Sequence, residues 1–150
     1  MATLGNLLKM RGGLPFTHRV VTLTLLLPDP KSGTPEAVEQ QVALLPVTHA
    51  AEARANRAAI EYCAARKEFG DAPLLDKELK FRFCIEAMRD AANLAAYFVD
   101  EDSIESFREV VIGEQLDYLL REYSELLAAE FVELQAKPIK DEARETFQGG

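Results

Sequence analysis

The sequence predicts a mainly helical protein with an N-terminal β-hairpin, an α+β fold in which three to four helices pack on the hairpin. Three observations support this prediction. Ala and Leu dominate the apolar residues and Trp is absent, which favours helices over a sandwich or barrel. A segment rich in β-branched residues lies near the N-terminus, and leucines recur every three or four residues near the C-terminus.

The length of 150 residues suits one domain with a single core. We expect this domain to span residues 16–136. Residues 1–15 combine a Gly-Gly pair and a proline with a short apolar cluster, and are predicted to form a flexible N-terminal arm. Residues 137–150 are charged and end in Gly-Gly, so they are predicted to form a flexible C-terminal tail.

Two strands are predicted around a turn. In residues 19–27 and again in residues 37–45, apolar side chains stand at every second position. Residues 28–35 between them are a dense cluster of Pro, Asp, Ser and Gly, which are turn formers. An antiparallel hairpin follows, and it must pack on helices because an isolated hairpin is marginal in water. The apolar residues expected on one face are Val21, Leu23, Leu25, Val38, Val42 and Leu44.

The first long helix is predicted over residues 48–69. Thr48 is a suitable N-cap, because its hydroxyl can accept a hydrogen bond from an amide of the first turn. The segment is rich in Ala, which has the highest helix propensity. Gly70 and Pro73 are expected to end the helix.

Residues 77–85 fit two patterns. Their apolar side chains alternate as in a strand, yet several of them also fall on one helical face. The pattern continues to Ala92 without a breaker, and Asp76 can act as an N-cap. We therefore predict a helix, with a strand as the alternative.

The C-terminal part is predicted to hold two more helices. An acidic stretch at residues 100–103 is expected to form a loop and a helix start, and residues 104–111 a short helix that ends at Gly113. Residues 114–134 give the clearest amphipathic helix in the chain.

Charge and hydropathy exclude two classes of partner. Net charge is −8, with 8 basic and 6 acidic residues in residues 1–70 but 9 and 19 in residues 71–150. An acidic half of this kind repels phosphate backbones, so no nucleic acid is expected to bind. The chain has no apolar run of the roughly 20 residues that span a bilayer, and its start does not resemble a signal peptide. We therefore expect no membrane contact and a cytoplasmic location.

The sequence offers no recognisable catalytic motif. His18 and His49 do not lie in any triad pattern, and Cys63 and Cys84 are expected to be a reduced, buried pair. The acidic residues 100–102 lack the glycine and the later glutamate of a calcium loop, and the chain has no phosphate-binding glycine motif. No catalytic residue, cofactor or metal is therefore predicted. An enzyme with an unrecognised pair of carboxylates stays an alternative, since 25 acidic residues always provide neighbours.

The helix at residues 114–134 carries a broad apolar stripe. One interpretation is that the stripe only buries the domain core. The other is that part of it stays free to bind an apolar helix of a partner protein. On this second interpretation the predicted partner-binding residues are Leu116, Leu119, Leu120, Tyr123, Leu127 and Phe131. The sequence leaves a homo-oligomer open.

The order of these elements resembles the small tail assembly chaperones, and related tail-region proteins, of tailed bacteriophages. The likeness runs from the first strand through the Pro-Asp-Pro-x-Ser-Gly turn and the strand end Leu-Leu-Pro-Val-Thr to the final helix, and covers residues 19–134. It is closest in residues 106–131, a short helix, a break and an amphipathic helix with leucines before Tyr123. The chain departs from the family in its N-terminal arm and in the tail after Pro138.

The resemblance implies a non-enzymatic role without a cofactor. Such a protein would bind the long apolar tape-measure protein in the host cytoplasm, keep it from aggregating, and help tail-tube subunits assemble around it. The alternative, of a different class, is a structural subunit of the phage particle, such as a connector or tail-completion protein.

Overall fold

The computed structural model describes residues 3–4, 18–66 and 72–136. The arm predicted at residues 1–15 therefore lies almost entirely outside the described residues, and the tail predicted at residues 137–150 lies wholly outside them. The α+β fold class, with its N-terminal hairpin and its helices, is confirmed. The elements in chain order are β1 (Arg19–Pro28), β2 (Pro35–Leu44), α2 (His49–Ala65), α3 (Ala72–Ala87), β3 (Met88–Asp90), α4 (Glu101–Val110) and α5 (Gly113–Ala136).

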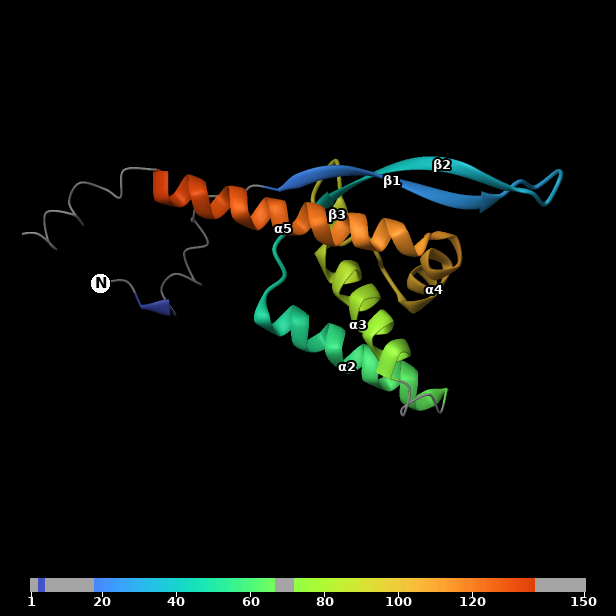
Figure 1. The fold of residues 1–150 in the computed structure, drawn as a ribbon, viewed down its shortest axis with the longest axis horizontal. Coiled ribbons are helices and arrows are strands. Elements are labelled where there is room, and N and C mark those ends of the chain that lie inside the picture. Colours follow the sequence, from blue (N-terminus) through green and yellow to red (C-terminus); the bar gives the residue numbers. More distant parts are fainter. Residues whose placement is uncertain (1–2, 5–17, 67–71, 137–150) are drawn as a thin grey trace, which may run out of the picture.

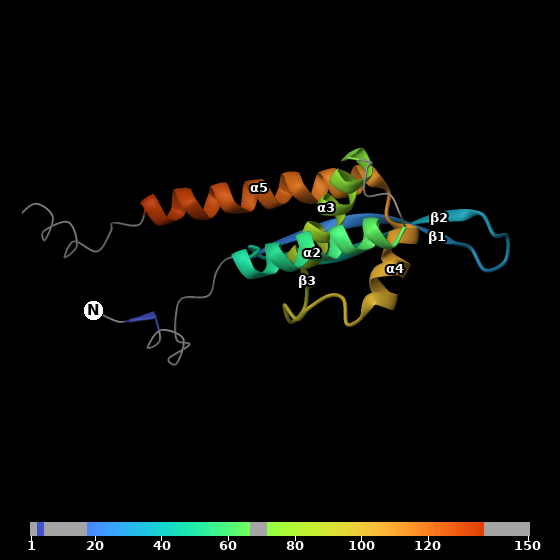
Figure 2. The same cartoon turned by 90° about the horizontal axis from the view of Figure 1, so that it is seen from below.

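The three strands form one antiparallel sheet in the order β1-β2-β3. Figure 1 shows the sheet along one side of the molecule, with α3 below it and α2 on the far side of α3. Viewed from below in Figure 2, α2 lies in front of the sheet, and the tip of the β1–β2 hairpin projects beyond the helices. The predicted hairpin therefore packs on helices only along its proximal half.

The two halves of the hairpin differ in burial. Val21, Leu23, Val42 and Leu44 are all less than 5% exposed, and they form the core together with side chains of α3, α4 and α5. Residues 26–37 are exposed except for Asp29, which is intermediate. The expected apolar face of the strands thus becomes core only where helices cover it.

The turn at the tip is built by Asp29. Its backbone N–H donates to the carbonyl of Thr34, and its carboxylate accepts from the N–H of Lys31 and the hydroxyl of Ser32. These bonds to the charged form lower the pKa of Asp29, the N–H of Lys31 having the largest effect. Gly33 takes a φ of 71°, a conformation that costs a glycine little.

The free edge of β1 is covered by α5. The N–H of Thr24 points away from β2 and donates to Oε1 of Gln115 at 2.9 Å. Nearer the start of the strand, the guanidinium of Arg19 forms an ion pair with Glu122. Helix α5 therefore protects this edge over the first part of β1, from Arg19 to Thr24.

Helix α2 starts at the predicted N-cap. The hydroxyl of Thr48 accepts from the N–H of Ala51, and the buried face is a line of small residues at every fourth position. Because these side chains are short, α2 can approach α3 closely. The buried residues of the helix are Ala51, Ala55, Ala59 and Cys63.

The helix predicted over residues 77–92 is α3. Its helical conformation is confirmed for residues 77–85, but the predicted positions of both ends were wrong. It begins at Ala72, so Asp76 lies inside it and is not the N-cap. It ends at Ala87, because the N–H of Leu45 takes the carbonyl of Ala87 and Met88 pairs with β2 as a strand. Sheet pairing outweighs the helical periodicity that continues to Ala92.

The acidic stretch does start a helix as predicted, but α4 begins at Glu101, three residues before the predicted start at Ile104. Asp100 and Ser103 form a reciprocal capping box, each side chain accepting from the backbone N–H of the other. The helix ends before Val111, which is extended and forms an isolated antiparallel bridge with Leu25. Gly113 is the first residue of α5, so the break comes before the glycine.

Candidate protein-binding site

The predicted apolar stripe on α5 is divided by the fold. Leu116 and Leu119 are 9% and 1% exposed and belong to the core. Both side chains are packed in the core, so their predicted role as partner contacts is corrected to a core role, although Leu116 also lines the polar cleft described below. The neighbouring Leu126 is also buried, at 3% exposed.

The other stripe residues are partly accessible. Tyr123 is half-buried: its hydroxyl accepts from the N–H of Val47 at 2.9 Å, and its ring meets Phe83 edge-on. Leu120 is half-buried too, and Leu127 is 39% exposed. The side chain of Phe131 lies outside the described residues. Leu120, Tyr123, Leu127 and the untested Phe131 therefore stay predicted contacts of this stripe.

A different apolar surface opens between the hairpin and α4. This hollow, here called the α4 hollow, has a volume of about 260 Å³. Its floor is buried, with Leu25 and Phe107 at 9% and 5% exposed, whereas Leu27 on its rim is 36% exposed. Its lining residues are Leu25, Leu27, Tyr97, Phe98, Ser103, Ser106, Phe107 and Val110.

Packed aromatic rings form one wall of the α4 hollow. The ring centroids of Tyr97 and Phe98 lie 5.0 Å apart, and those of Phe98 and Phe107 lie 5.2 Å apart. Phe107 also stacks on Phe81 of α3, which connects the wall to the core. The rings thus brace one another, and all three of Tyr97, Phe98 and Phe107 line the hollow.

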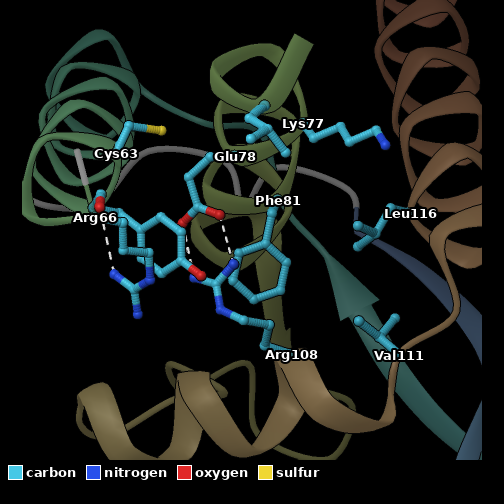
Figure 3. Close-up of a pocket in the computed structure, with 10 residues that line it drawn as sticks. Cys63, Arg66, Lys77, Glu78, Phe81, Arg108, Val111 and Leu116 are labelled. Carbon is cyan, nitrogen blue, oxygen red and sulfur yellow. Dashed lines mark hydrogen bonds and ion pairs between the residues drawn. The ribbon is translucent and has the colours of Figure 1, made fainter. Parts of the chain in front are cut away.

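The chain also forms a polar cleft of about 450 Å³ between α2, α3 and α4, shown in Figure 3. Glu78, only 4% exposed, accepts from Nε of Arg82 at 3.1 Å and from a terminal nitrogen of Arg108 at 2.8 Å. The guanidinium of Arg108 also lies 4.0 Å from the ring centroid of Tyr62. These contacts tie the three helices together.

Charge pairing dominates this polar cleft. Burial alone would lower the pKa of Arg108. The hydrogen bonds with Glu78 and Glu105 outweigh burial, so the pKa lies above the usual value of an arginine. Arg82 in turn donates to Glu101 at 3.1 Å. Because these charges are engaged with one another, the cluster serves to join α3 to α4.

The residues singled out for chemistry lie apart. His18 and His49 are exposed, whereas Cys63 and Cys84 are buried and not disulfide-bonded. Burial raises the pKa of the Cys84 thiol to about 12, so at neutral pH it is the unreactive neutral form. Across residues 18–66 and 72–136, no three His, Cys, Asp or Glu side chains gather in a way that could hold a metal ion. No helix in the same ranges is long and apolar enough to cross a membrane.

The α4 hollow was not predicted from the sequence. One signal was present: Tyr97, Phe98 and Val99 are three large apolar residues in a row outside any predicted helix or strand, and Val99 is 87% exposed. Such a run in a loop indicates either packing on a neighbouring element or a contact surface. Here Tyr97 and Phe98 line the hollow.

Comparisons with known proteins identify no similar protein. A scan against protein-family models finds no match, and searches of curated proteins and of solved structures find none either. The resemblance to phage tail assembly chaperones therefore stays a prediction from element order.

Proposed function

We propose that the protein is a non-enzymatic assembly protein that binds an apolar helical segment of another protein, as a phage tail assembly chaperone holds the tape-measure protein. The observation that carries this proposal is the α4 hollow, whose lining is mostly apolar although it opens to solvent. Apolar surface of this kind is costly to leave in water, and a partner that covers it gains binding free energy.

The shape of the rim supports a helical client. Ser103 and Ser106 are small, lie one helical turn apart on α4 and both line the hollow. A client helix can approach closely over such residues and insert one or two large apolar side chains beside Leu27, the arrangement of an amphipathic helix in a groove.

The charge near the hollow indicates the kind of client. Asp100, Glu101 and Asp102 are exposed at the start of α4, next to the lining residue Ser103. Asp100 caps α4 and Glu101 pairs with Arg82. A Lys or Arg beside the apolar face of a client helix would therefore pair chiefly with Asp102 and associate faster. The proposal places this binding in the cytoplasm, which is the host cytoplasm if the protein is phage-encoded.

Site-specific photo-crosslinking in the producing cell tests the proposal. A benzophenone amino acid replaces Leu27 at the rim of the hollow or, as a matched control, Leu127 on α5; the two leucines are 36% and 39% exposed. We expect the probe at position 27 to crosslink to an apolar amphipathic helix of one partner, identified by mass spectrometry. Crosslinks only from position 127 would move the site to the predicted stripe, and none from either position would contradict the proposal.

A structural subunit of a particle is the second candidate, and the projecting hairpin favours it. Residues 30–37 at its tip are all exposed, although the strands are paired up to Pro28 and Pro35. Projecting arms of this kind are suited to docking on neighbouring subunits. A fixed copy number in purified particles would support this candidate, whereas a chaperone is absent from the finished particle.

A further inference from the structure

The outer edge of β2 carries backbone N–H and C=O groups that form no hydrogen bonds with another strand in the described part of the chain. β3 pairs only with residues 42–44 of β2, which leaves the edge open over residues 35–41. β1 covers the other edge of β2 along its whole length. β2 itself can therefore accept a further strand only along this open edge.

The hydrogen-bond pattern identifies which residues face outward. In an antiparallel pair, backbone groups alternate between pointing toward the partner strand and pointing away from it. The N–H of Asp29 bonds across the hairpin to Thr34, and the N–H of Thr24 points outward to Gln115. The partner of Thr24 is Glu39, so the N–H and C=O groups of Glu39 also face away from β1.

The same alternation places the backbone groups of Ala37 and Gln41 outward, while those of Val38 point toward β1. At Gln41, the side-chain amide of Gln40 donates to the outward carbonyl at 3.2 Å. The outward carbonyl of Gln41 is thus already satisfied from within the chain, whereas Ala37 and Glu39 are exposed and ready to pair.

We propose that this edge binds a second copy of the chain, with the two β2 strands antiparallel and a two-fold axis at Val38. In this register Ala37 of each copy pairs with Glu39 of the other, which satisfies both outward groups. Gln41 pairs with Pro35 of the second copy; Pro35 has no N–H to offer, and the Gln41 carbonyl needs none because Gln40 already donates to it.

The placement of the glutamates favours this register over its neighbour. Glu36 stands opposite Gln40 of the second copy, and Glu39 stands opposite Ala37, so no carboxylate faces another directly. A shift that centres the axis on Glu39 would bring two glutamates face to face and is disfavoured. The apolar Val38 side chains meet at the axis, where two-fold symmetry gives both copies the same contact.

Charge substitutions at Ala37 test the proposal by sedimentation of the full chain over a range of concentrations. The wild type is expected to show a monomer–dimer equilibrium. Ala37→Glu places like charges opposite each other twice, so it should raise the dimer Kd roughly 2- to 30-fold. Ala37→Lys should lower the Kd, and Ala37→Gln is the uncharged control. Since Ala37 is exposed, circular dichroism of all variants should match the wild type.

A cysteine at the axis tests the register separately. Under mild oxidation with diamide, Val38→Cys should form a disulfide-linked dimer, because residues opposite each other in a non-hydrogen-bonded pair are spaced for a disulfide. Ala37→Cys should not, because each Ala37 faces Glu39 of the other copy. The buried Cys63 and Cys84 are shielded from the oxidant. A chain that stays monomeric at its highest soluble concentration, or equal crosslinking at both positions, would overturn the proposal.

Discussion

The hydroxyl oxygen of Tyr123 accepts a hydrogen bond from the backbone N–H of Val47 at 2.9 Å, across 76 positions of the chain. This bond joins the middle of α5 to the segment between β2 and α2. Together with the burial of Leu119, it anchors the inner line of the leucine stripe in the domain. The surface proposed for a client therefore lies elsewhere, in the α4 hollow.

Removing the Tyr123 hydroxyl should weaken the domain without unfolding it. Tyr123→Phe leaves the N–H of Val47 without its acceptor, and we expect the free energy of unfolding to fall by about 0.5–1.5 kcal/mol. Urea unfolding at constant m-value measures this change. Tyr118→Phe, also on α5 but with no hydroxyl hydrogen bond among the described residues, is the control and should leave stability almost unchanged.

Two leucines of the stripe should respond differently to truncation. Leu119 is 1% exposed, so Leu119→Ala should cost about 2–5 kcal/mol of stability. Leu127 is 39% exposed, and Leu127→Ala should change stability by less than about 0.5 kcal/mol. Thermal and urea unfolding of both variants measure the difference, and equal losses would contradict the division of the stripe.

The buried carboxylate of Glu78 is expected to matter more than its exposed counterpart. Glu78→Gln leaves Arg82, whose side chain is 7% exposed, with only the exposed carboxylates of Glu101 and Glu105 as counter-charges, so the variant should lose about 1.5–3 kcal/mol. Glu105 also pairs with Arg108, but its side chain is 42% exposed, so Glu105→Gln should cost at most about 1 kcal/mol. A larger loss for Glu105→Gln would show that burial does not govern this cluster.

The thiol of Cys84 gives a pH-dependent signature. Burial raises its folded pKa from 9.0 to about 12, so its contribution to stability is complete below pH 9 and is lost as pH rises toward 12. In that window the wild type should lose about 1.4 kcal/mol per pH unit more than Cys84→Ala. Urea unfolding at about pH 9.5 and pH 10.5, both inside this window, compares the two slopes, and parallel slopes would refute the shift.

Local patterns in the sequence were enough to predict much of the fold. The hairpin follows from alternation over residues 19–27 and from turn formers, and the start of α2 follows from Thr48. The strand β3 could not be foreseen, since its three residues leave the helical pattern only to pair with β2, more than 40 positions earlier. Such pairing depends on the assembled sheet and leaves no periodic trace in Met88–Asp90.

Less of the candidate site than of the fold could be predicted from the sequence. Periodicity shows which face of α5 is apolar, but it does not show what covers that face, and Leu119 turned out to be core. The α4 hollow joins Leu27 of β1, Phe98 of a loop and Val110 of α4. These residues come from three separate segments, so only the folded chain brings them together.

Titration of the partner segment against two arginine variants tests the central claim most directly. Ser106 and Ser124 are both exposed helical serines, but only Ser106 lines the α4 hollow. The probe is a synthetic peptide of the helix that crosslinks to position 27, and calorimetry gives its Kd. Ser106→Arg places a bulky charge at the rim of the hollow and should weaken binding at least about tenfold, while Ser124→Arg binds as the wild type does. Equal affinities for all three proteins would contradict the account.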